Sequence, residues 1–361
     1  MKDNPNILEF CLSPDLGGLE LFMVNCFKYF KTKTSCFLII DKNTKLDTYI
    51  TDTTKIYIKR NKLFPILPAL QLAKFIDDNN IDIIHFHWTK DIATVVLGKI
   101  FSKRKPSIIQ TRNMTMTRFK DDFYHKWLYK NIDTIHAVTF QVKEQLTKFI
   151  PQDIRPDIKV VYMGTDIIEI SNTNNLRENY NINNEFIVGI VGRIEEGKGQ
   201  YLVIEAIAKL KHLNIKALIV GHTMDEAYLQ GLKQKVKKLN IESKIIFTGF
   251  TKEVYKHLML CDVTVLATPR ETFGLVIIES MACKVPVIAT NNGGPLEIIE
   301  DETDGLLFNR TSNDLANKIE KLYNNKNLKE KLSQNAFKKI EAKFNKPKQN
   351  QLLYEVIKTS L

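Results

Sequence analysis

Short apolar runs with the character of β-strands alternate along the whole chain with helical segments, and this alternation constrains the fold more than any other feature. Strands that alternate with helices favour a parallel sheet whose two faces are both covered by helices. We predict helices over residues 19–30, 66–79 and 275–283, and a basic helical tail over 329–360. The predicted strands are 6–12, 36–41, 55–58, 81–86, 107–110, 134–138, 158–162, 186–191, 216–220, 244–248, 262–266, 285–289 and 305–308.

The length of the chain and one polar segment indicate two domains. With 361 residues, the chain is long enough for two α/β domains, each with its own buried core. The segment 164–175 is polar and poor in apolar anchors, which makes it the best linker candidate. We therefore predict an N-terminal domain over residues 1–168 and a C-terminal domain over residues 169–339.

A glycine turn joins the predicted strand 262–266 to the predicted helix 275–283. Such a turn directs free backbone N–H groups and the positive end of the helix dipole at whatever lies in front, usually a phosphate. Glu271 lies in the turn, and Glu279 lies about one and a half turns into the helix. An anion site flanked by two carboxylates suits a ligand with both phosphates and hydroxyls, such as a nucleotide sugar.

Two cations and two glycines fall in loops that could face the same ligand. Arg193 and Lys198 follow the predicted strand 186–191. Two cations there would stabilise the negative charge that develops as a nucleoside diphosphate leaves. The alternative is an arginine and a lysine at the surface near a turn. Gly17 and Gly18 would let another loop approach the phosphate, although two adjacent glycines also form an ordinary turn.

Together these motifs resemble those of retaining glycosyltransferases with the two-domain GT-B fold, in particular glycosyltransferase family four (group 1). The similarity extends over nearly the whole chain and is densest from residue 186 to residue 310. The resemblance implies two Rossmann-like doubly wound domains that face each other across a cleft, with a final helix at about 340–361 packed on the first domain. The matching segments are Glu271 to Glu279 (E-x7-E), Gly17-Gly18-Leu19-Glu20, Val191-Gly192-Arg193 with Lys198-Gly199, Gly249, and Asn292-Gly293-Gly294-Pro295-Leu296-Glu297.

The resemblance also implies roles for single residues. Glu271 would be catalytic and contact the hydroxyls of the donor sugar, and Glu279 would accept hydrogen bonds from the ribose. The diphosphate would be bound by Arg193, Lys198, Gly274, Leu275, Gly17 and Gly18, while Phe273 would lie beside the donor sugar.

The base pocket and the stereochemistry follow from the same resemblance. Residues 246–250 would line the base pocket, with Phe247 and Gly249 in it, mostly through backbone contacts. The sequence shows no dedicated nucleophile, so we expect front-face attack in which the departing phosphate acts as the base and the product is an α-linkage. Positioning and electrostatics would then supply most of the acceleration.

Two histidines end the predicted strand 81–86. Alternation along an extended segment puts His85 and His87 on the same side. By resemblance, one of them contacts the donor sugar near the reacting carbon. We favour His87 as this catalytic residue, because ligands of α/β folds collect at the carboxyl ends of strands. The alternatives are a metal site, for which no third ligand at metal spacing is evident, and a histidine that is only part of the core.

Arg112 follows another strand, at a place where many relatives have a nearby histidine. With Arg118 and Lys120, it could bind an anionic acceptor, or it could merely cap a loop. We assign Arg112 and His85 to the acceptor site on this basis.

Composition sets limits on cofactors and cellular location. The chain contains no D-x-D motif, so we expect no metal and no cofactor, with the nucleotide sugar as co-substrate. Five scattered cysteines without a C-x-x-C pair suit reduced thiols in the cytoplasm. There is no apolar run of 18 residues and no secretory h-region, so we expect neither a transmembrane helix nor secretion.

The net charge of +11 has two interpretations. One is a basic face that contacts an anionic membrane surface weakly, at the cytoplasmic side of the inner membrane. The other is an ordinary solvated surface. Nucleic acid is not expected as a partner, because no nucleic-acid-binding motif accompanies the charge.

The leading hypothesis is a retaining, metal-independent hexosyltransferase. It would use a nucleotide-sugar donor and a saccharide or lipid-linked saccharide acceptor, in the assembly of lipopolysaccharide, capsule or another cell-surface glycan. The alternatives are a nucleotide-sugar epimerase or a phosphorylase on the same scaffold, and a non-catalytic basic module associated with a membrane.

Overall fold

The computed structural model describes residues 4–61, 64–169 and 173–360. The chain forms two compact units. Unit 1 comprises Met1–Tyr162 together with Lys348–Leu361, and unit 2 comprises Met163–Pro347. The division therefore follows Tyr162, where the sequence suggested residue 168, and the returning segment starts at Lys348, where the sequence suggested about residue 340.

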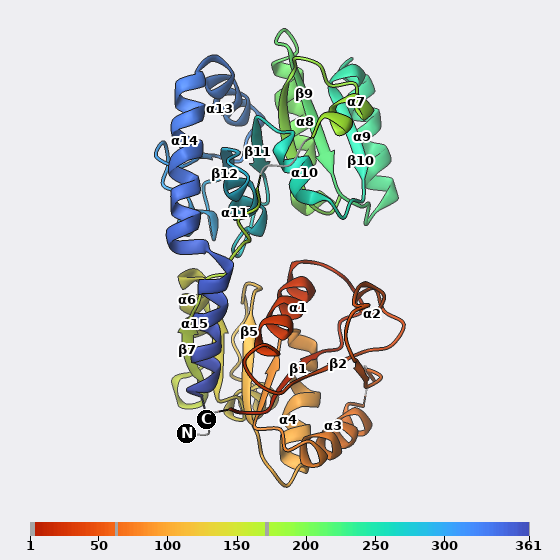
Figure 1. Cartoon of the computed structure of the whole chain (residues 1–361), viewed down its shortest axis with the longest axis vertical. Coiled ribbons are helices and arrows are strands. Elements are labelled where there is room, and N and C mark those ends of the chain that lie inside the picture. Colours follow the sequence, from red (N-terminus) through yellow and green to blue (C-terminus); the bar gives the residue numbers. More distant parts are fainter. Residues whose placement is uncertain (1–3, 62–63, 170–172, 361) are drawn as a thin grey trace. The chain divides into compact units, whose positions relative to one another are not determined.

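Unit 1 is built on a seven-stranded sheet in the order β3-β2-β1-β4-β5-β6-β7, and every pair of neighbouring strands is parallel (Figure 1). The chain order reverses between β1 and β4, which is where doubly wound folds bind their ligands, at the carboxyl ends of the strands. The strands are β1 (Ile7–Cys11), β2 (Cys36–Ile40), β3 (Ile56–Tyr57), β4 (Ile83–Phe86), β5 (Ser107–Arg112), β6 (Thr134–Ala137) and β7 (Asp157–Val160).

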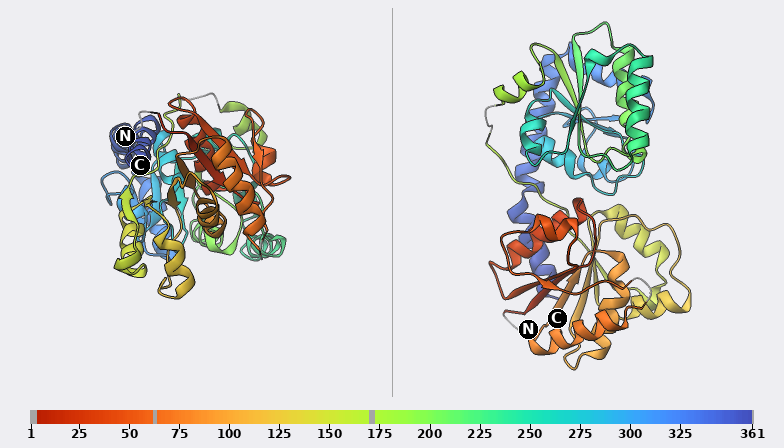
Figure 2. Two further views of the ribbon diagram at one scale, coloured as in Figure 1. Left: turned by 90° about the horizontal axis from the view of Figure 1, so that it is seen from below. Right: turned by 90° about the vertical axis from the view of Figure 1, so that its right-hand side faces the viewer.

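Helices cover both faces of this sheet, as the right-hand view of Figure 2 shows. Helix α1 packs its buried face, which includes Met23 and Phe27, against the apolar side chains of β1 and β2. Such an apolar stripe is what a surface helix presents to a core. The helices of unit 1 before the final segment are α1 (Gly18–Phe30), α2 (Lys45–Tyr49), α3 (Ile66–Asp78), α4 (Ile92–Phe101), α5 (Phe123–Lys130) and α6 (Phe140–Phe149).

Unit 2 has a parallel six-stranded sheet in the order β10-β9-β8-β11-β12-β13. Its order reverses between β8 and β11. Residues of α8 (Gln200–Lys209), α9 (Glu226–Lys238) and α13 (Ser312–Asn324) form the core on one face. Residues of α10 (Val254–Met259) and Cys283, which follows α11 (Leu275–Ala282), contribute to the core on the other. The strands are β8 (Phe186–Val191), β9 (Ile215–Val220), β10 (Ile245–Gly249), β11 (Val263–Leu266), β12 (Val287–Thr290) and β13 (Leu306–Phe308).

The helices of unit 2 end in a segment that returns the chain to unit 1. They are α7 (Asn174–Asn179), α8 (Gln200–Lys209), α9 (Glu226–Lys238), α10 (Val254–Met259), α11 (Leu275–Ala282), α12 (Pro295–Ile298), α13 (Ser312–Asn324) and α14 (Lys326–Lys339), followed by a π-helical turn at Ile340–Phe344 and by α15 (Lys346–Lys358).

Helix α15 belongs to unit 1 over most of its length. The Tyr29 hydroxyl donates to Oε1 of Gln351 at 2.5 Å, and the rings of Phe30 and Tyr354 lie 5.8 Å apart. The Ser107 hydroxyl also donates to the carbonyl oxygen of Ser360 at 2.7 Å. These contacts fix the end of the chain on the N-terminal unit.

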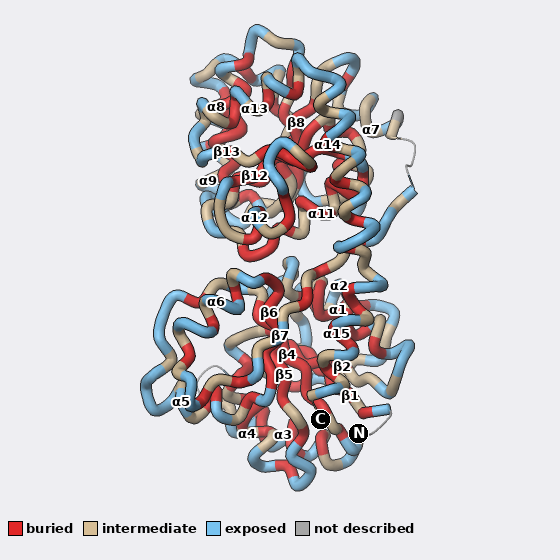
Figure 3. The backbone as a smooth tube through the Cα atoms, turned by 90° about the vertical axis from the view of Figure 1, so that its left-hand side faces the viewer, coloured by how far each residue is buried: buried red, intermediate tan, exposed pale blue. Residues whose placement is uncertain are grey.

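Each predicted strand overlaps an observed one, and the predicted α/β class with two doubly wound parallel sheets is confirmed. The buried stretches of backbone in Figure 3 follow the strands of each sheet. Parallel strands are buried on both faces, so they read as nearly continuous apolar runs in the sequence.

Candidate functional site

The E-x7-E segment of unit 2 has the predicted turn geometry. The segment follows β11, and Gly274 precedes α11 with φ = 99°, a conformation that favours glycine. A Cβ atom at Gly274 would lie 2.8 Å from Cδ1 of Ile277. In the first turn of α11, the Ile277 N–H donates to the Gly274 carbonyl oxygen at 2.9 Å. The N–H groups of Leu275 and Val276 have no preceding helical carbonyl to bond, so they are available to a ligand.

The second glycine-rich segment supports this turn directly. The Gly294 N–H donates to the Glu271 carbonyl oxygen at 2.9 Å. A Cβ atom at Gly294 would lie 2.4 Å from the Thr272 carbonyl oxygen, so only glycine fits without a shift of the backbone. The two motifs, which are some twenty residues apart in the sequence, therefore form one packed loop pair.

Lys198 and Glu271 meet at the carboxyl ends of the adjacent strands β8 and β11. Lys198 Nζ lies 3.4 Å from Glu271 Oε2, and both side chains are partly buried. The structure thus places a cation, a carboxylate and a helix N-terminus around one point, next to the reversal of strand order in unit 2.

Arg193 lies close by but makes a different contact. Its Nη2 atom pairs with Oε1 of Glu195 at 2.9 Å, and the carbonyl oxygen of Arg193 accepts from Nε2 of Gln200 at 2.8 Å. The guanidinium is thus bonded to its own loop. Its contact with a diphosphate stays a prediction.

Glu279 is a partly buried carboxyl group on α11 in unit 2. Burial raises the pKa of Glu279 to about 7, and the nearby Lys346 opposes this rise. Burial and the charge of Glu279 raise the pKa of Tyr255, whose hydroxyl lies 3.1 Å from that of Thr165. Within the described ranges, the Glu279 carboxylate has no hydrogen bond or ion pair, which leaves it free to accept ligand hydroxyls. No pattern in the sequence indicates that Tyr255 and Lys346 lie near Glu279.

The predicted base pocket is only partly what the sequence suggested. The Phe247 ring is partly buried and packs against the core of unit 2. Its contact with a base stays a prediction. Gly249 has φ = 75°, and its carbonyl oxygen accepts from the Gly221 N–H at 3.0 Å. The next residue, Phe250, has 61% of its surface exposed and meets the His222 ring edge-on at 6.0 Å. We regard Phe250 as the better candidate for an aromatic contact with a base.

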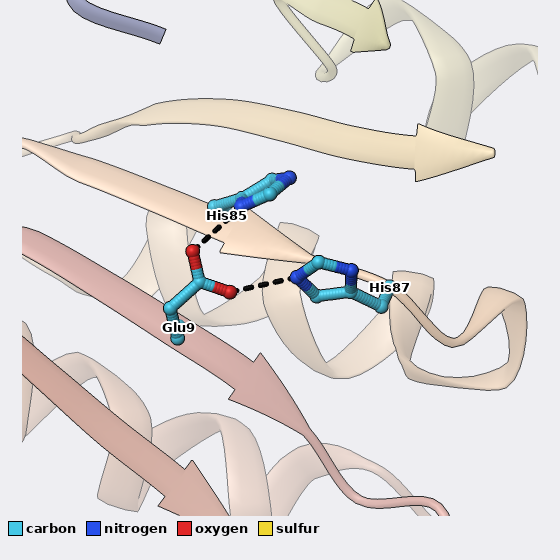
Figure 4. Close-up of side chains that lie close together, drawn as sticks. All are labelled: Glu9, His85 and His87. Atoms are coloured by element: carbon cyan, nitrogen blue, oxygen red, sulfur yellow. Dashed lines mark hydrogen bonds and ion pairs between the residues drawn. The ribbon is translucent and has the colours of Figure 1, made fainter. Parts of the chain in front are cut away.

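In unit 1, both predicted histidines bind a carboxylate that the sequence analysis missed. Glu9 is paired with His85 in the β1–β4 register and is fully buried. Its Oε1 atom lies 2.7 Å from Nδ1 of His85, and its Oε2 atom lies 2.7 Å from Nε2 of His87 (Figure 4). The only signal in the sequence was an acidic residue inside an otherwise apolar strand.

The network continues from His85 across the sheet. His85 Nε2 lies 2.6 Å from the Thr111 hydroxyl, which lies 2.9 Å from Nδ1 of His136. His136 Nε2 donates to the Val161 carbonyl oxygen at 2.8 Å. The carbonyl can only accept, so Thr111 donates to His136 and accepts from His85, and His85 donates from both ring nitrogens.

The pKa values agree with this pattern of donors. Burial would raise the pKa of Glu9, but the two histidines beside it bring it below its ordinary value. Burial and the neighbouring His85 lower the pKa of His87 to about 4. Burial lowers the pKa of His136 to about 3. His87 is therefore neutral at neutral pH, donates from Nε2 and carries a lone pair on Nδ1.

His87 Nδ1 is the one ring nitrogen of the Glu9, His85 and His87 group without a partner among the described residues. It lies on the side of the ring that faces away from Glu9 (Figure 4). The centres of the Phe22 and His87 rings lie 6.0 Å apart in an edge-on arrangement, and His87 is 1% exposed. A ligand hydroxyl could reach Nδ1 only after a local movement in unit 1.

The same three side chains bear on the metal question. Their ligand atoms lie within 4.8 Å of one another, so the expectation that no third ligand accompanies the histidines was wrong. The atoms are, however, already at hydrogen-bond distance, with one carboxylate oxygen for each imidazole. A shared metal ion would have to displace these protons. The absence of a metal requirement stays a prediction.

Acid should destabilise unit 1 because of these histidines. Their native pKa values lie below the unfolded value of about 6.5, so the unfolded chain binds more protons. The stabilisation is complete above pH 6.5 and is lost as the pH falls toward 4. We expect about 3 kcal/mol for His87 at about 1.4 kcal/mol per pH unit. Urea unfolding at pH 7, 6 and 5 tests this, and a His87→Asn variant should show a shallower slope. Asp91, whose pKa burial raises to about 8, opposes this loss over the same pH range. The decisive comparison is therefore between variants, and an equal change in the free energy of unfolding from pH 7 to pH 5 in the native chain and in His87→Asn would contradict the prediction.

The two acceptor residues predicted from the sequence have internal roles. His85 is fully buried and bonded at both nitrogens, so its assignment to an acceptor site was wrong. Arg112 donates to the carbonyl oxygens of Met114 and Thr115 and to the Thr89 hydroxyl, at 2.8, 2.9 and 2.7 Å. Its guanidinium caps loops, which is the alternative that the sequence left open.

The loop with Gly17 and Gly18 is held at its start. The Leu12 N–H donates to Oδ2 of Asp91 at 2.8 Å, and the Ser13 hydroxyl donates to Oε1 of Glu20 at 2.5 Å. Burial raises the pKa of Asp91 to about 8. The loop thus starts from a defined position at the carboxyl end of β1, although its contact with a phosphate stays a prediction.

Comparison with known proteins gives two family matches. Residues 172–339 match the family described as glycosyl transferases group 1, and residues 9–139 match the family described as glycosyl transferase 4-like. The two matches lie in unit 2 and unit 1, respectively.

Curated relatives match over different lengths. The capsular polysaccharide biosynthesis glycosyltransferase CapM of Staphylococcus aureus is 32% identical over 52% of this chain and 49% of its own length. An N-acetylgalactosamine-N,N'-diacetylbacillosaminyl-diphospho-undecaprenol 4-alpha-N-acetylgalactosaminyltransferase of Campylobacter jejuni is 33% identical over 41% of this chain and 39% of its own length. The matched part of this chain therefore spans less than half of either relative. An uncharacterised glycosyltransferase of Methanocaldococcus jannaschii is 26% identical over 92% of this chain and 91% of its own.

Solved structures share the fold over the whole chain. A glycosyltransferase of Rickettsia africae has a TM-score of 0.89 at 22% identity and covers 99% of both chains. HepE of Anabaena, crystallised with UDP, has a TM-score of 0.84 at 21% identity and covers 98% of this chain and 100% of its own. The predicted GT-B class is confirmed, and both units match glycosyltransferase families. The chain belongs to the group 1, family-four glycosyltransferases of GT-B fold.

Proposed function

We propose that this protein transfers a hexose-type sugar from a nucleoside-diphosphate sugar to a hydroxyl acceptor, with retention of configuration and without a metal. The observation that carries the proposal is the arrangement in unit 2 of Lys198, Glu271 and the N-terminus of α11, which the Gly274 turn opens toward a ligand. A cation and a helix N-terminus are the groups that bind a diphosphate without a metal ion.

Different residues of unit 2 would bind different parts of the donor. Lys198 and the first N–H groups of α11 would hold the diphosphate, and Arg193 would join them if it left Glu195. Glu279, with no partner among the described residues, would accept the two ribose hydroxyls. Glu271 would accept hydroxyls of the sugar while it pairs with Lys198.

The transfer step needs no covalent enzyme intermediate. The acceptor oxygen would form a bond to the anomeric carbon as the bond from that carbon to the phosphate oxygen breaks. The acceptor proton would pass to the departing diphosphate on the same face, which gives retention. The fixed positive groups would stabilise the charge that develops on the diphosphate.

His87 of unit 1 would complete the chemistry as a hydrogen-bond acceptor. Its tautomer leaves a lone pair on Nδ1, which suits a sugar hydroxyl better than a charged imidazolium would. A hydroxyl bonded there would be oriented without a change in charge.

We propose that the acceptor is an intermediate in the assembly of a cell-surface glycan. CapM acts in capsular polysaccharide biosynthesis, and the name of the Campylobacter relative includes a diphospho-undecaprenol. Among the residues that the structure describes, no helix is both long and apolar enough to cross a membrane. We propose a cytoplasmic enzyme with weak peripheral contact to an anionic membrane.

Binding of a nucleotide is the direct test. We expect one of UDP, GDP, ADP, TDP and CMP to raise the melting temperature of the native chain, since a ligand at 100 times its Kd adds about 2.7 kcal/mol of stability. UDP is the first choice because HepE was crystallised with it. Lys198→Ala should abolish the shift, and Lys209→Ala, at the end of α8, serves as a matched surface control. Equal shifts in both variants, or no shift with any nucleotide, would contradict the proposed donor site.

A further inference from the structure

Unit 1 contains a cavity of about 300 Å³ that neither the proposed donor site nor the histidine network uses. It lies between the connection that follows β4 and the start of α5. None of the ten residues that line it is acidic. The polar and aromatic residues used below, which we call the cationic pocket, are Arg60, Lys90, Lys120, Tyr124 and His125.

Two of these cations are held in place by an aromatic ring and not by a carboxylate. The Arg60 guanidinium lies 4.5 Å from the centre of the Trp88 ring, and Lys90 Nζ lies 5.2 Å from it. In the described parts of the chain, neither side chain forms an ion pair with an acidic residue. A cation stacked on a ring keeps its hydrogen-bond donors for another partner.

The third cation of the pocket, Lys120, lies near other positive charges. Burial, Arg112 and Arg118 lower the pKa of Lys120, which Asp122 only partly offsets. Lys120 Nζ lies 3.4 Å from Nε2 of His125. An anion in the pocket would relieve this repulsion.

The acidic residues close to the pocket do not neutralise it. Asp122 is bonded to Nδ1 and to the backbone N–H of His125, outside the lining. Asp41 accepts the backbone N–H of Arg60 at 3.3 Å. Asp91 is fully buried, and burial raises its pKa to about 8, so it is largely uncharged at neutral pH. The pocket therefore keeps a net positive charge.

Exposed aromatic side chains adjoin the pocket on the side of α5. Tyr124 lines the pocket with 52% of its surface exposed, while its neighbour Phe123 is 88% exposed. Phe119, next to Lys120, is 56% exposed. Three exposed rings beside a basic pocket suit a ligand with an anionic group attached to an apolar chain.

We propose that the cationic pocket binds the phosphate or diphosphate group of the acceptor, and that an apolar group carried on this phosphate lies over Phe119, Phe123 and Tyr124. Arginine binds phosphate with paired hydrogen bonds, and lysine binds it as a point charge. The inference rests on the proposed function only in naming the ligand as the acceptor. Lys120 is also part of the anion site that the sequence suggests around Arg112, but the Arg112 guanidinium is bonded to the carbonyl oxygens of Met114 and Thr115.

Binding can be measured without donor or turnover. The chain has two tryptophans, so a Trp127→Phe protein reports on Trp88 alone, the ring under Arg60 and Lys90. Geranyl diphosphate, a soluble phosphate on an apolar chain, should change the Trp88 fluorescence in a saturable way. Arg60→Gln and Lys120→Gln should each weaken binding at least tenfold. Lys126→Gln, on α5 beside the pocket residues Tyr124 and His125 but outside the lining, is the control and should change it less than twofold. Calorimetry on the native chain checks that the Trp127→Phe change is neutral.

Three further ligands and variants separate the alternatives. Geranyl diphosphate should bind normally to Lys198→Ala, and loss of binding there would move the ligand to unit 2 and overturn the inference. Inorganic pyrophosphate should bind at least fivefold more weakly, and equal affinity would overturn the role of the exposed rings. Binding to phosphatidylglycerol vesicles that needs Arg60, without saturable binding of geranyl diphosphate, would assign the pocket to membrane headgroups instead. Failure of every nucleotide to bind would defeat the proposed function and leave this result intact.

Discussion

Replacing Glu271 by alanine is expected to lower kcat about 100- to 1,000-fold, the loss seen when one group that stabilises a transition state is removed. In the proposed reaction, Glu271 orients the donor sugar and fixes Lys198, whose Nζ lies 3.4 Å from its carboxylate. The variant therefore loses a sugar contact and loosens a diphosphate contact at once. The measurement is release of the nucleoside diphosphate, with acceptor or by slow hydrolysis of the donor.

The fold should survive this substitution, because the Glu271 side chain is 19% exposed and lies in a loop. Its melting temperature should stay close to that of the native chain. Glu271→Gln keeps the shape of the side chain without its charge, so its kcat should lie between those of the native chain and of Glu271→Ala. Glu205→Gln, which removes a surface ion pair with Lys235 in the same unit, is the control. Turnover of Glu271→Ala within threefold of the native rate would show that this carboxylate has no role in the reaction.

Replacing Glu9 should have a large effect on stability in one variant and on activity in another. Glu9→Ala leaves two buried imidazoles without their acceptor. Removal of one partner of a buried, hydrogen-bonded charge pair costs about 3–5 kcal/mol. Urea or thermal unfolding of unit 1 measures this loss.

Glu9→Gln keeps the volume and tests the position of the protons. The amide group offers one acceptor and one donor, so one imidazole must stop donating to residue 9: His85 by losing one of its two protons, or His87 by reversing its tautomer. If that imidazole is His87, Nδ1 becomes a donor and the proposed hydrogen bond to the donor sugar is lost. A buried hydroxyl left without its acceptor costs about 1–3 kcal/mol, which lowers kcat roughly five- to 150-fold.

Nitrogen NMR of the imidazoles separates this positioning role from a purely structural one. Native His87 should show a proton on Nε2, and the Glu9→Gln variant should show it on Nδ1. His125, which is partly exposed in the same unit, provides an internal reference. An unchanged His87 tautomer together with reduced activity would mean that Glu9 acts in some other way. Zinc that binds tightly to the native chain and not to Glu9→Ala would instead favour a metal at these three residues.

Local patterns in the sequence were sufficient for the strands, for the three predicted helices that overlap α1, α3 and α11, and for the E-x7-E turn. The tail predicted as helical over 329–360 is divided into α14, a π-helical turn and α15. Each predicted strand was found because a buried parallel strand is apolar along its length, which is a property of neighbouring residues. The turn at Gly274 was likewise evident, because a glycine between a strand and a helix is typical of a tight turn with a positive φ. The boundary between the two domains was predicted less accurately. The polarity of residues 164–175 indicates a segment at the surface, but it does not show at which residue the chain stops contacting unit 1 and starts contacting unit 2.

The contacts between distant residues were decided only by the tertiary structure. Glu9 lies beside His85 because β1 is the neighbour of β4 in the sheet, and the spacing of residues along the chain does not contain that register. The same holds for Arg112, whose guanidinium is occupied by carbonyls that the following loop turns toward it. The cationic pocket draws on residues 60, 90 and 120–129 from three separate connections.

The sequence by itself therefore determined the α/β architecture, the family and the E-x7-E turn of this protein, because each depends on short segments with a local physical signature. Which charged groups are satisfied internally and which remain free for a ligand was decided by the tertiary structure. That outcome depends on packing between segments that are far apart in the chain, where a single neighbour can turn a candidate ligand such as Arg112 into a structural cap.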